Sequence, residues 1–241
     1  MTTPPDVDVE RALVVTAHPD DVDFGTAGTV STWTGAGIAV TYCVCTAGDS
    51  GAFEGVPRGE VARLRRDEQR AAATAVGVSD VRFLDHQDGR VVADLGLRRD
   101  IARVIRQVRP QLVVSHSPEI AWEHLVVSHP DHRAVGEAAL AAVYPDARNE
   151  HAHPELLDEG LAPWTVPALW LSGSPEQRIN RAVDITDHFE AKLAALAAHR
   201  SQTAHLDDLR DTMRQHLERN AQRHGLAAGR LAEVFHAVDT S

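Results

Sequence analysis

The chain has 241 residues, of which 43% are hydrophobic, and its formal net charge is −11. This length suffices for one large core, so we expect a single domain spanning residues 1–241. The acidic balance argues against a nucleic-acid partner, which would require a basic face, and no apolar run approaches the about 20 residues that span a bilayer. Because residues 1–10 also lack the pattern of a signal peptide, we expect a cytoplasmic protein with no membrane insertion and an irregular start over residues 1–8.

The first predicted element is an apolar run at residues 12–17. The run is short and rich in β-branched residues, as is typical of a buried parallel strand, and ligands gather beyond the carboxyl ends of such strands. His18 and Asp21 follow it directly and lie three residues apart in one turn, so both can face one divalent cation while Asp20 points elsewhere. The alternative is structural, with the two aspartates as helix N-caps and His18 as an ordinary loop histidine.

Strands and helices then alternate along the chain. Further strands are predicted at residues 38–45, 81–84, 111–115, 168–172 and 181–185, with an edge strand at 232–238. Helices are predicted at residues 58–76, 97–108 and 206–224, after His129, and after a cap at Thr186 or Asp187, whereas residues 149–167 read as a loop. This order predicts a three-layer, Rossmann-like α/β fold with a mostly parallel central sheet. Cys43 and Cys45 are predicted to be buried free thiols.

A second cluster, Ser128-His129-Pro130-Asp131-His132, opens the helix predicted in the middle of the chain. Pro130 suits the first helical position, and Ser128 or His129 can cap the helix. Because a residue before proline is pushed into extended geometry, His129 and His132 should leave the helix in different directions and serve different roles. Two such clusters at junctions that lead into helices are hard to explain by chance.

Together, His18-Pro19-Asp20-Asp21 and His129-Pro130-Asp131-His132 resemble the LmbE-like family of zinc-dependent de-N-acetylases, related to the N-acetylglucosaminyl-phosphatidylinositol deacetylase. Weaker matches are Arg65-Arg66-Asp67-Glu68, Gln87-Asp88-Gly89, Val183-Asp184-Ile185-Thr186, Lys192 and His199-Arg200-Ser201-Gln202. The likeness covers most of the chain. It implies a zinc-dependent hydrolase that removes an N-acetyl or related N-acyl group from a small-molecule substrate, an amino sugar or a small sugar conjugate.

The residues and the resemblance together predict a metal site. His18, Asp21 and His132 are the predicted ligands of Zn²⁺, or of another divalent transition metal, with a position left open for water. Asp20 lies next to a ligand yet stays free of the metal, so we predict that it is the general base, and the resemblance implies the same role.

His129 is the predicted electrophile and proton donor. Asp131, within hydrogen-bond reach, would hold it as an imidazolium by raising its pKa. The alternative is that His129 only caps the helix. Some members of the family carry a tyrosine at the position of Val127, and since valine cannot donate, one charged donor must serve both the oxyanion and the leaving amine.

The resemblance implies two substrate-binding residues, Arg65 in the pocket and Asp88 as an acceptor of a sugar hydroxyl. Local chemistry offers an alternative for each. Arg65 and Glu68 lie at i and i+3 and could form a salt bridge on the helix surface, and Asp-Gly is ordinary turn chemistry. We interpret His116 as a residue at the rim of the pocket or behind the ligands, and Lys192 as a packing or salt-bridging residue, as we do His199.

Two other functions use the same types of residue. A metallo-phosphoesterase would show more carboxylates and a ligand that bridges to a second metal, and a closed, non-catalytic metal-binding module would make Asp20 and His129 redundant. Members of the family often assemble, so a homo-oligomer stays open, although no stretch of the sequence marks an interface.

Overall fold

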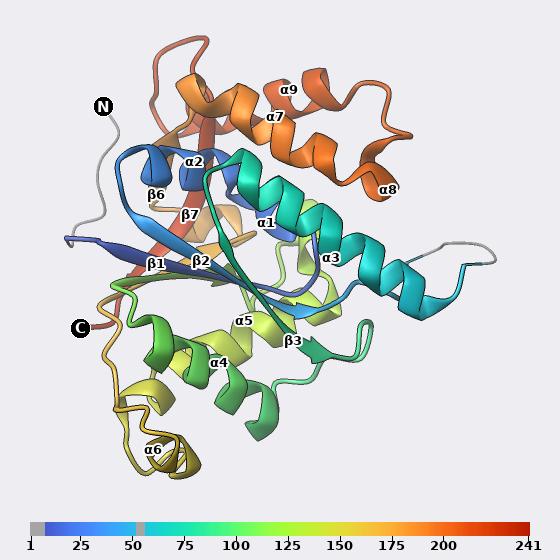
Figure 1. The fold of residues 1–241 in the computed structure, drawn as a ribbon. Helices are drawn as coiled ribbons and strands as arrows, with labels where there is room; N and C mark the ends of the chain where they lie inside the picture. The colour runs from blue at the N-terminus through green and yellow to red at the C-terminus, as the bar shows by residue number, and fades with distance from the viewer. Residues whose placement is uncertain (1–7, 52–55) are drawn as a thin grey trace.

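The computed structural model describes residues 8–51 and 56–241, so most of the irregular start predicted for residues 1–8 lies outside the described residues. Within these ranges one sheet has the order β3-β2-β1-β4-β5-β7-β6 (Figure 1). Its strands are β1 (Arg11–Thr16), β2 (Ala39–Thr46), β3 (Asp80–His86), β4 (Leu112–His116), β5 (Ala168–Ser172), β6 (Arg181–Asp184) and β7 (Ala232–Asp239). The first five pair in parallel, whereas β7 runs antiparallel to both β5 and β6.

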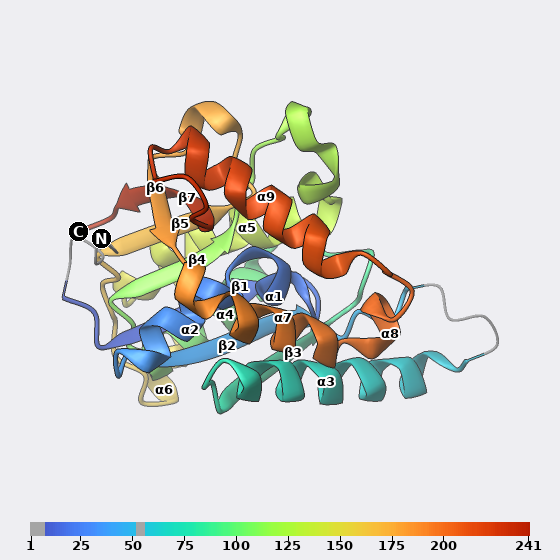
Figure 2. The same ribbon diagram turned by 90° about the horizontal axis from the view of Figure 1, so that it is seen from above.

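Helices cover both faces of this sheet (Figures 1 and 2). One layer contains α1 (Asp21–Gly25), α2 (Ala27–Gly35), α3 (Arg58–Ala75), α7 (Phe189–Ala198), α8 (Arg200–Thr203) and α9 (Leu209–Arg223). The other contains α4 (Leu95–Val108), α5 (Pro130–Val143) and α6 (Glu155–Asp158), and the 3-10 helix η1 (Trp122–Ser128) leads into α5. The predicted three-layer α/β fold with a mostly parallel sheet is confirmed.

Residues 12–15 of strand β1 are all apolar because both faces of the strand are buried, and the polar Arg11 and Thr16 lie at its two ends. Ala12 and Val14 pack in the core under the α3 and α7 layer, and Leu13 and Val15 pack in the core under the α4 and α5 layer. A strand covered on both sides needs no polar positions, which is why its sequence shows an apolar run instead of alternation. The ionisable residues His18, Asp20 and Asp21 follow in the turn after the strand.

Two predicted segments differ from the structure. The strand predicted at residues 232–238 as an edge lies inside the sheet, because β7 pairs on both sides and leaves β6 at the edge. The segment predicted as a loop at residues 149–167 contains the short helix α6. The prediction for Cys43 and Cys45 is confirmed, since both are buried and free.

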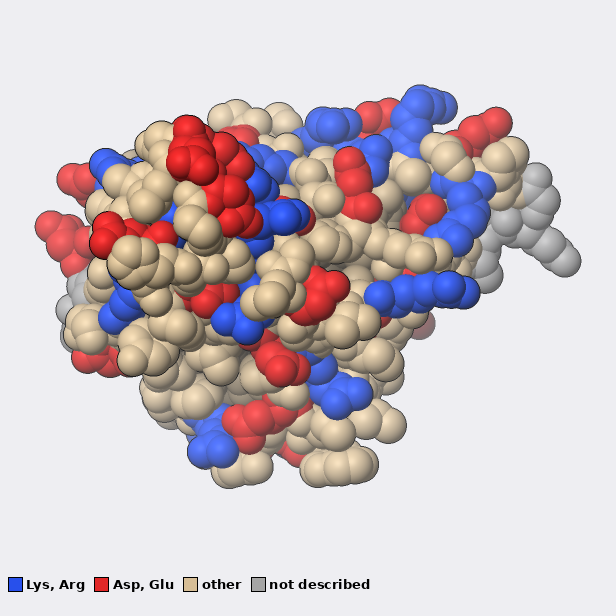
Figure 3. Space-filling view, turned by 90° about the horizontal axis from the view of Figure 1, so that it is seen from below, with Lys and Arg blue, Asp and Glu red and all other residues tan. Residues whose placement is uncertain are grey.

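None of the helices in the described ranges is long and apolar enough to cross a membrane. On the face shown in Figure 3, acidic and basic side chains are interspersed, and they do not form a continuous basic surface of the kind that binds a nucleic-acid backbone.

Candidate active site

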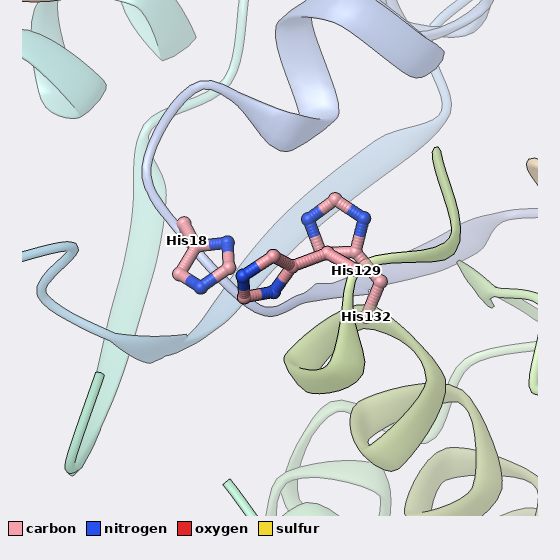
Figure 4. A group of neighbouring side chains, drawn as sticks. All are labelled: His18, His129 and His132. Atoms are coloured by element: carbon pink, nitrogen blue, oxygen red, sulfur yellow. The ribbon is translucent and has the colours of Figure 1, made fainter. Parts of the chain in front are cut away.

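Two neighbouring strands carry the candidate site at their carboxyl ends. β1 and β4 pair in parallel, so the turn after β1 and His116, the last residue of β4, meet at one edge of the sheet. Helix α5 packs closely against the end of β4 because Gly136, in the middle of the helix, has no side chain, and a Cβ there would lie 2.4 Å from the carbonyl oxygen of His116. As a result, the rings of His18, His129 and His132 converge between the turn after β1 and α5 (Figure 4).

The carboxylate of Asp21 lies at the centre of this cluster. Its Oδ1 is 3.1 Å from Nε2 of His132, and its Oδ2 is 3.3 Å from both Nδ1 of His18 and Nε2 of His116. Oδ2 also accepts the backbone N–H of His18 at 2.7 Å, which closes the turn. Burial would raise the pKa of Asp21, but the surrounding imidazoles outweigh burial and hold this pKa well below its usual range.

His132 is oriented as a metal ligand would be. Its Nδ1 lies 3.1 Å from the carbonyl oxygen of Val127, which can only accept, so Nδ1 carries a proton. Burial lowers the pKa of His132, but Asp21 outweighs burial and raises it, so the space between Nε2 and Asp21 favours a positive charge, either a proton or a metal ion. A histidine that donates its second N–H to a backbone carbonyl is the usual arrangement at metal sites.

His18 lies among three carboxylates. Its Nε2 is 3.1 Å from Asp88 and 3.2 Å from Asp131, while its Nδ1 faces Asp21. Burial lowers the pKa of His18, but the hydrogen bonds to Asp131 and Asp21 outweigh burial and raise the pKa to about 12. The pocket therefore favours positive charge beside Asp21, and a divalent cation would supply it.

Three overlapping groups of side chains in the described ranges bring their ligand atoms within 4.8 Å of one another. They are His18, His129 and His132; Asp21, His116 and His132; and His18, Asp88 and Asp131. Imidazole and carboxylate donors in this combination fit a divalent metal ion. The predicted ligands all belong to these groups, although they are divided between them.

Comparison with known proteins agrees with this chemistry. Residues 13–143 match the family model described as PIG-L, GlcNAc-PI de-N-acetylase. The chain belongs to the PIG-L family. The resemblance to LmbE-like deacetylases is thereby confirmed. A PIG-L relative, the diacetylchitobiose deacetylase of Thermococcus kodakarensis, is 33% identical over 196 residues, which cover 81% of this chain and 71% of the relative.

Solved structures share the fold of this PIG-L protein. The N,N'-diacetylchitobiose deacetylase of Pyrococcus horikoshii has a TM-score of 0.86 and 29% identity, covering 97% of this chain and 85% of that chain. The 4-carboxy-2-hydroxymuconate hydratase of Pseudomonas putida has a TM-score of 0.78 and 25% identity, covering 95% of this chain and 96% of that chain. Because one fold carries two different named reactions, the side chains of the site must decide the chemistry.

Asp20 stands beside the His/Asp cluster of this PIG-L site without joining it. Its Oδ2 accepts from Nη2 of Arg65 at 3.1 Å. It occupies the N-cap position of α1, but its side chain makes no capping hydrogen bond, so the structural alternative does not hold for Asp20. Burial and the adjacent Asp21 carboxylate raise the pKa of Asp20 to about 6, while Arg65 opposes this rise.

His129 caps α5, as the structural alternative predicted. Its Nδ1 accepts the backbone N–H of Asp131 at 3.2 Å. The carboxylate of Asp131 is engaged elsewhere, because its Oδ2 lies 3.2 Å from Nε2 of His18 and accepts the N–H of Gly89 at 2.7 Å. Burial and the neighbouring His18 lower the pKa of His129, so the prediction that Asp131 holds it as an imidazolium is wrong.

Arg65 is buried at the base of the site. Besides Asp20, its guanidinium donates to the carbonyl oxygens of Gly48 and Pro19, each at 2.7 Å. The predicted alternative, a surface salt bridge with Glu68, is wrong, because Glu68 accepts the N–H of Ser201 at 2.8 Å instead. The predicted contact of Arg65 with substrate stays a prediction.

Asp88 also makes contacts within the protein. Its Oδ1 faces His18 at 3.1 Å and its Oδ2 accepts the N–H of Ser50 at 2.6 Å. Burial would raise the pKa of Asp88, but these hydrogen bonds lower it to about 2. The turn alternative is also seen, since Gly89 has a φ of 76°. The role of Asp88 toward a sugar hydroxyl stays a prediction.

Reasoning from the sequence did not identify His116 as a member of the candidate metal groups. The residue is buried, its Nε2 accepts the N–H of Ala17 at 3.1 Å, and its ring stacks on that of His132 with centroids 4.2 Å apart. A usable signal was its place as the last residue of the central strand β4, where the chemistry of such sheets gathers.

Proposed function

We propose that the chain is a zinc-dependent hydrolase that removes the N-acetyl group from an amino sugar or a small sugar conjugate, releasing acetate and a free amine. The observation that carries this proposal is the pair formed by Asp21, ringed by imidazoles, and Asp20, whose carboxylate is held outside that ring by Arg65. The substrate class follows from the family description and from the two diacetylchitobiose deacetylases. The free thiols of Cys43 and Cys45 favour a reducing compartment such as the cytoplasm.

His18, Asp21 and His132 would hold the zinc ion. When bound there, the ion supplies a water with a pKa lowered to about 7 and polarises the amide carbonyl. Asp131 would fix the orientation of the His18 ring through its hydrogen bond to Nε2, the ring nitrogen that does not face Asp21. Carboxylates commonly orient histidine ligands in this way.

Asp20 takes the proton of the attacking water as the water oxygen bonds to the carbonyl carbon. His129 faces the developing oxyanion: because its Nδ1 accepts the N–H of Asp131, the neutral ring carries its proton on Nε2 and can donate there. Since a neutral imidazole has no second proton to give, we assign protonation of the leaving nitrogen to Asp20, which returns the proton it took. The C–N bond then breaks.

The direct test is acetate release from a panel of N-acetylated amino sugars, with and without a chelator. We expect stoichiometric acetate and free amine from at least one member of the panel, loss of the reaction after chelation, and recovery on addition of zinc. A zinc-loaded enzyme that releases no acetate would overturn the proposal and direct attention to other reactions of this fold, such as hydration.

His129→Ala is expected to keep its zinc and to lose about 10²–10³-fold in kcat, the usual effect of removing one donor to an oxyanion. Elemental analysis and steady-state kinetics check both parts. His129→Asn retains a side chain that can cap α5, so comparison of the two variants separates loss of the cap from loss of the donor. Full turnover in His129→Ala would assign the oxyanion to another group.

A further inference from the structure

Behind the site, buried polar side chains connect Asp20 with the C-terminal helices. The backbone N–H of Asp20 donates to Oε1 of Gln69 at 2.8 Å, and Nε2 of Gln69 donates to Oδ2 of Asp23 at 2.9 Å. The same oxygen of Asp23 lies 2.7 Å from Nε2 of His199, which follows α7. Gln69, Asp23 and His199 are each 0% exposed, so water does not compete for these contacts.

The partners determine how the amide of Gln69 is turned. The N–H of Asp20 can only donate, so it needs the carbonyl oxygen of Gln69. The carboxylate of Asp23 can only accept, so it needs the NH₂ group of Gln69, and it takes the Nε2–H of His199 on the same oxygen. A reversed amide would bring two donors together on one side and two acceptors on the other. Asp23 and His199 therefore keep the oxygen of Gln69 directed at Asp20.

Asp20 needs such a support. Its φ is 87°, in the left-handed region that residues with a side chain rarely adopt. Gln69 lies four residues after Arg65 in α3, so the two side chains leave the helix on the same face. Arg65 holds the carboxylate of Asp20 and the carbonyl oxygen of Pro19, and Gln69 holds the amide of Asp20. Two residues of the same helix therefore hold Asp20, Gln69 through its backbone and Arg65 through its side chain.

We infer that Gln69, oriented by Asp23 and His199, is a positioning residue that holds the Asp20 carboxylate where it can take the proton of the attacking water. The inference rests on the proposed role of Asp20 as the base. Gln69 acts through Asp20, because an amide does not accept a proton at neutral pH and its two polar atoms are engaged by Asp20 and Asp23.

Gln69→Met keeps the length of the side chain and removes both hydrogen bonds. We expect kcat to fall about 10²-fold, the effect of a displacement of a reacting group by about 1 Å, with KM and zinc content unchanged. The matched control is Gln215→Met, the same substitution at an exposed position of α9, which should behave as the parent enzyme. A parental kcat in folded, zinc-loaded Gln69→Met would overturn the inference.

A double-mutant comparison separates positioning from general destabilisation. In an Asp20→Asn background, Gln69→Met should cause no further loss of single-turnover rate, because the group that Gln69 positions no longer acts as a base. An equal loss in both backgrounds would show a structural effect and overturn the inference.

The role of His199 is tested by two substitutions. His199→Gln, which can still donate to Asp23, should keep most of the turnover that His199→Met loses. Equal rates in these two variants would show that His199 does not orient Gln69 through Asp23.

A readout that needs no turnover keeps this test separate from that of the proposed function. Exchange of the Asp20 amide proton with solvent should be slow in the parent protein and fast in Gln69→Met, as measured by NMR. If the parent enzyme releases no acetate, the proposed function fails, whereas an exchange rate that Gln69→Met leaves unchanged contradicts the contact on which the inference depends.

Discussion

Asp20→Asn is expected to keep its zinc and to lose about 10²–10⁴-fold in kcat, the range found when a general base is removed. Asparagine has the size of aspartate, and its side-chain oxygen can still accept from Arg65, so the turn after β1 should be preserved. The amide of asparagine cannot take a proton from water, as the carboxylate of aspartate can. Elemental analysis and steady-state kinetics on the same preparation measure both quantities.

Two comparisons sharpen this result. Asp21→Asn changes the adjacent carboxylate, which faces His18, His116 and His132, and should lose the metal as well as turnover. Asp67→Asn changes a carboxylate that is 56% exposed on α3 and should alter neither. If Asp20→Asn turns over as the parent enzyme does, the base is another residue.

His132→Ala is expected to lose stoichiometric zinc, and with it nearly all turnover. The substitution removes the Nε2 that faces Asp21 and also the Nδ1–H that anchors the ring to Val127, which leaves only two of the three proposed protein ligands. Elemental analysis after dialysis measures the loss directly.

The control for this variant is His151→Ala, because the side chain of His151 is 84% exposed and lies outside the candidate metal groups. It should retain the zinc of the parent protein. Tightly held, stoichiometric zinc in His132→Ala would contradict the ligand assignment and transfer the role to His116 or His129, each of which shares a candidate group with His132.

Local sequence chemistry determined much of the fold and of the site. The short, β-branched apolar run before His18 predicted a strand buried on both faces, because a strand with one exposed face would show alternation. Pro130 could begin a helix but not continue one, which located the start of α5 correctly. The contact of Asp21 with His18 follows from their spacing of three residues in one turn, whereas its contact with His132 needs α5 to pack beside that turn.

Only the tertiary structure decided which distant groups meet. The carboxylate of Asp131 contacts His18 and the loop after β3, and it makes no hydrogen bond to the ring of His129, two residues before it. A hydrogen bond depends on the direction of its two groups and not on their separation along the chain. The same reason applies to Gln69 and to the pair of Asp23 and His199, which are 176 positions apart and meet only when α7 packs over α1.

The sequence also did not determine the position of β7 in the sheet. Its apolar pattern predicts a strand, but pairing partners depend on the path of the chain, and α9 returns it between β5 and β6. Hydrophobic patterns and local spacing thus determined the elements and the residue types of the site, since these depend on neighbours along the chain. The tertiary structure decided the order of the last strands and the partner of each buried polar group, since these depend on how the layers pack.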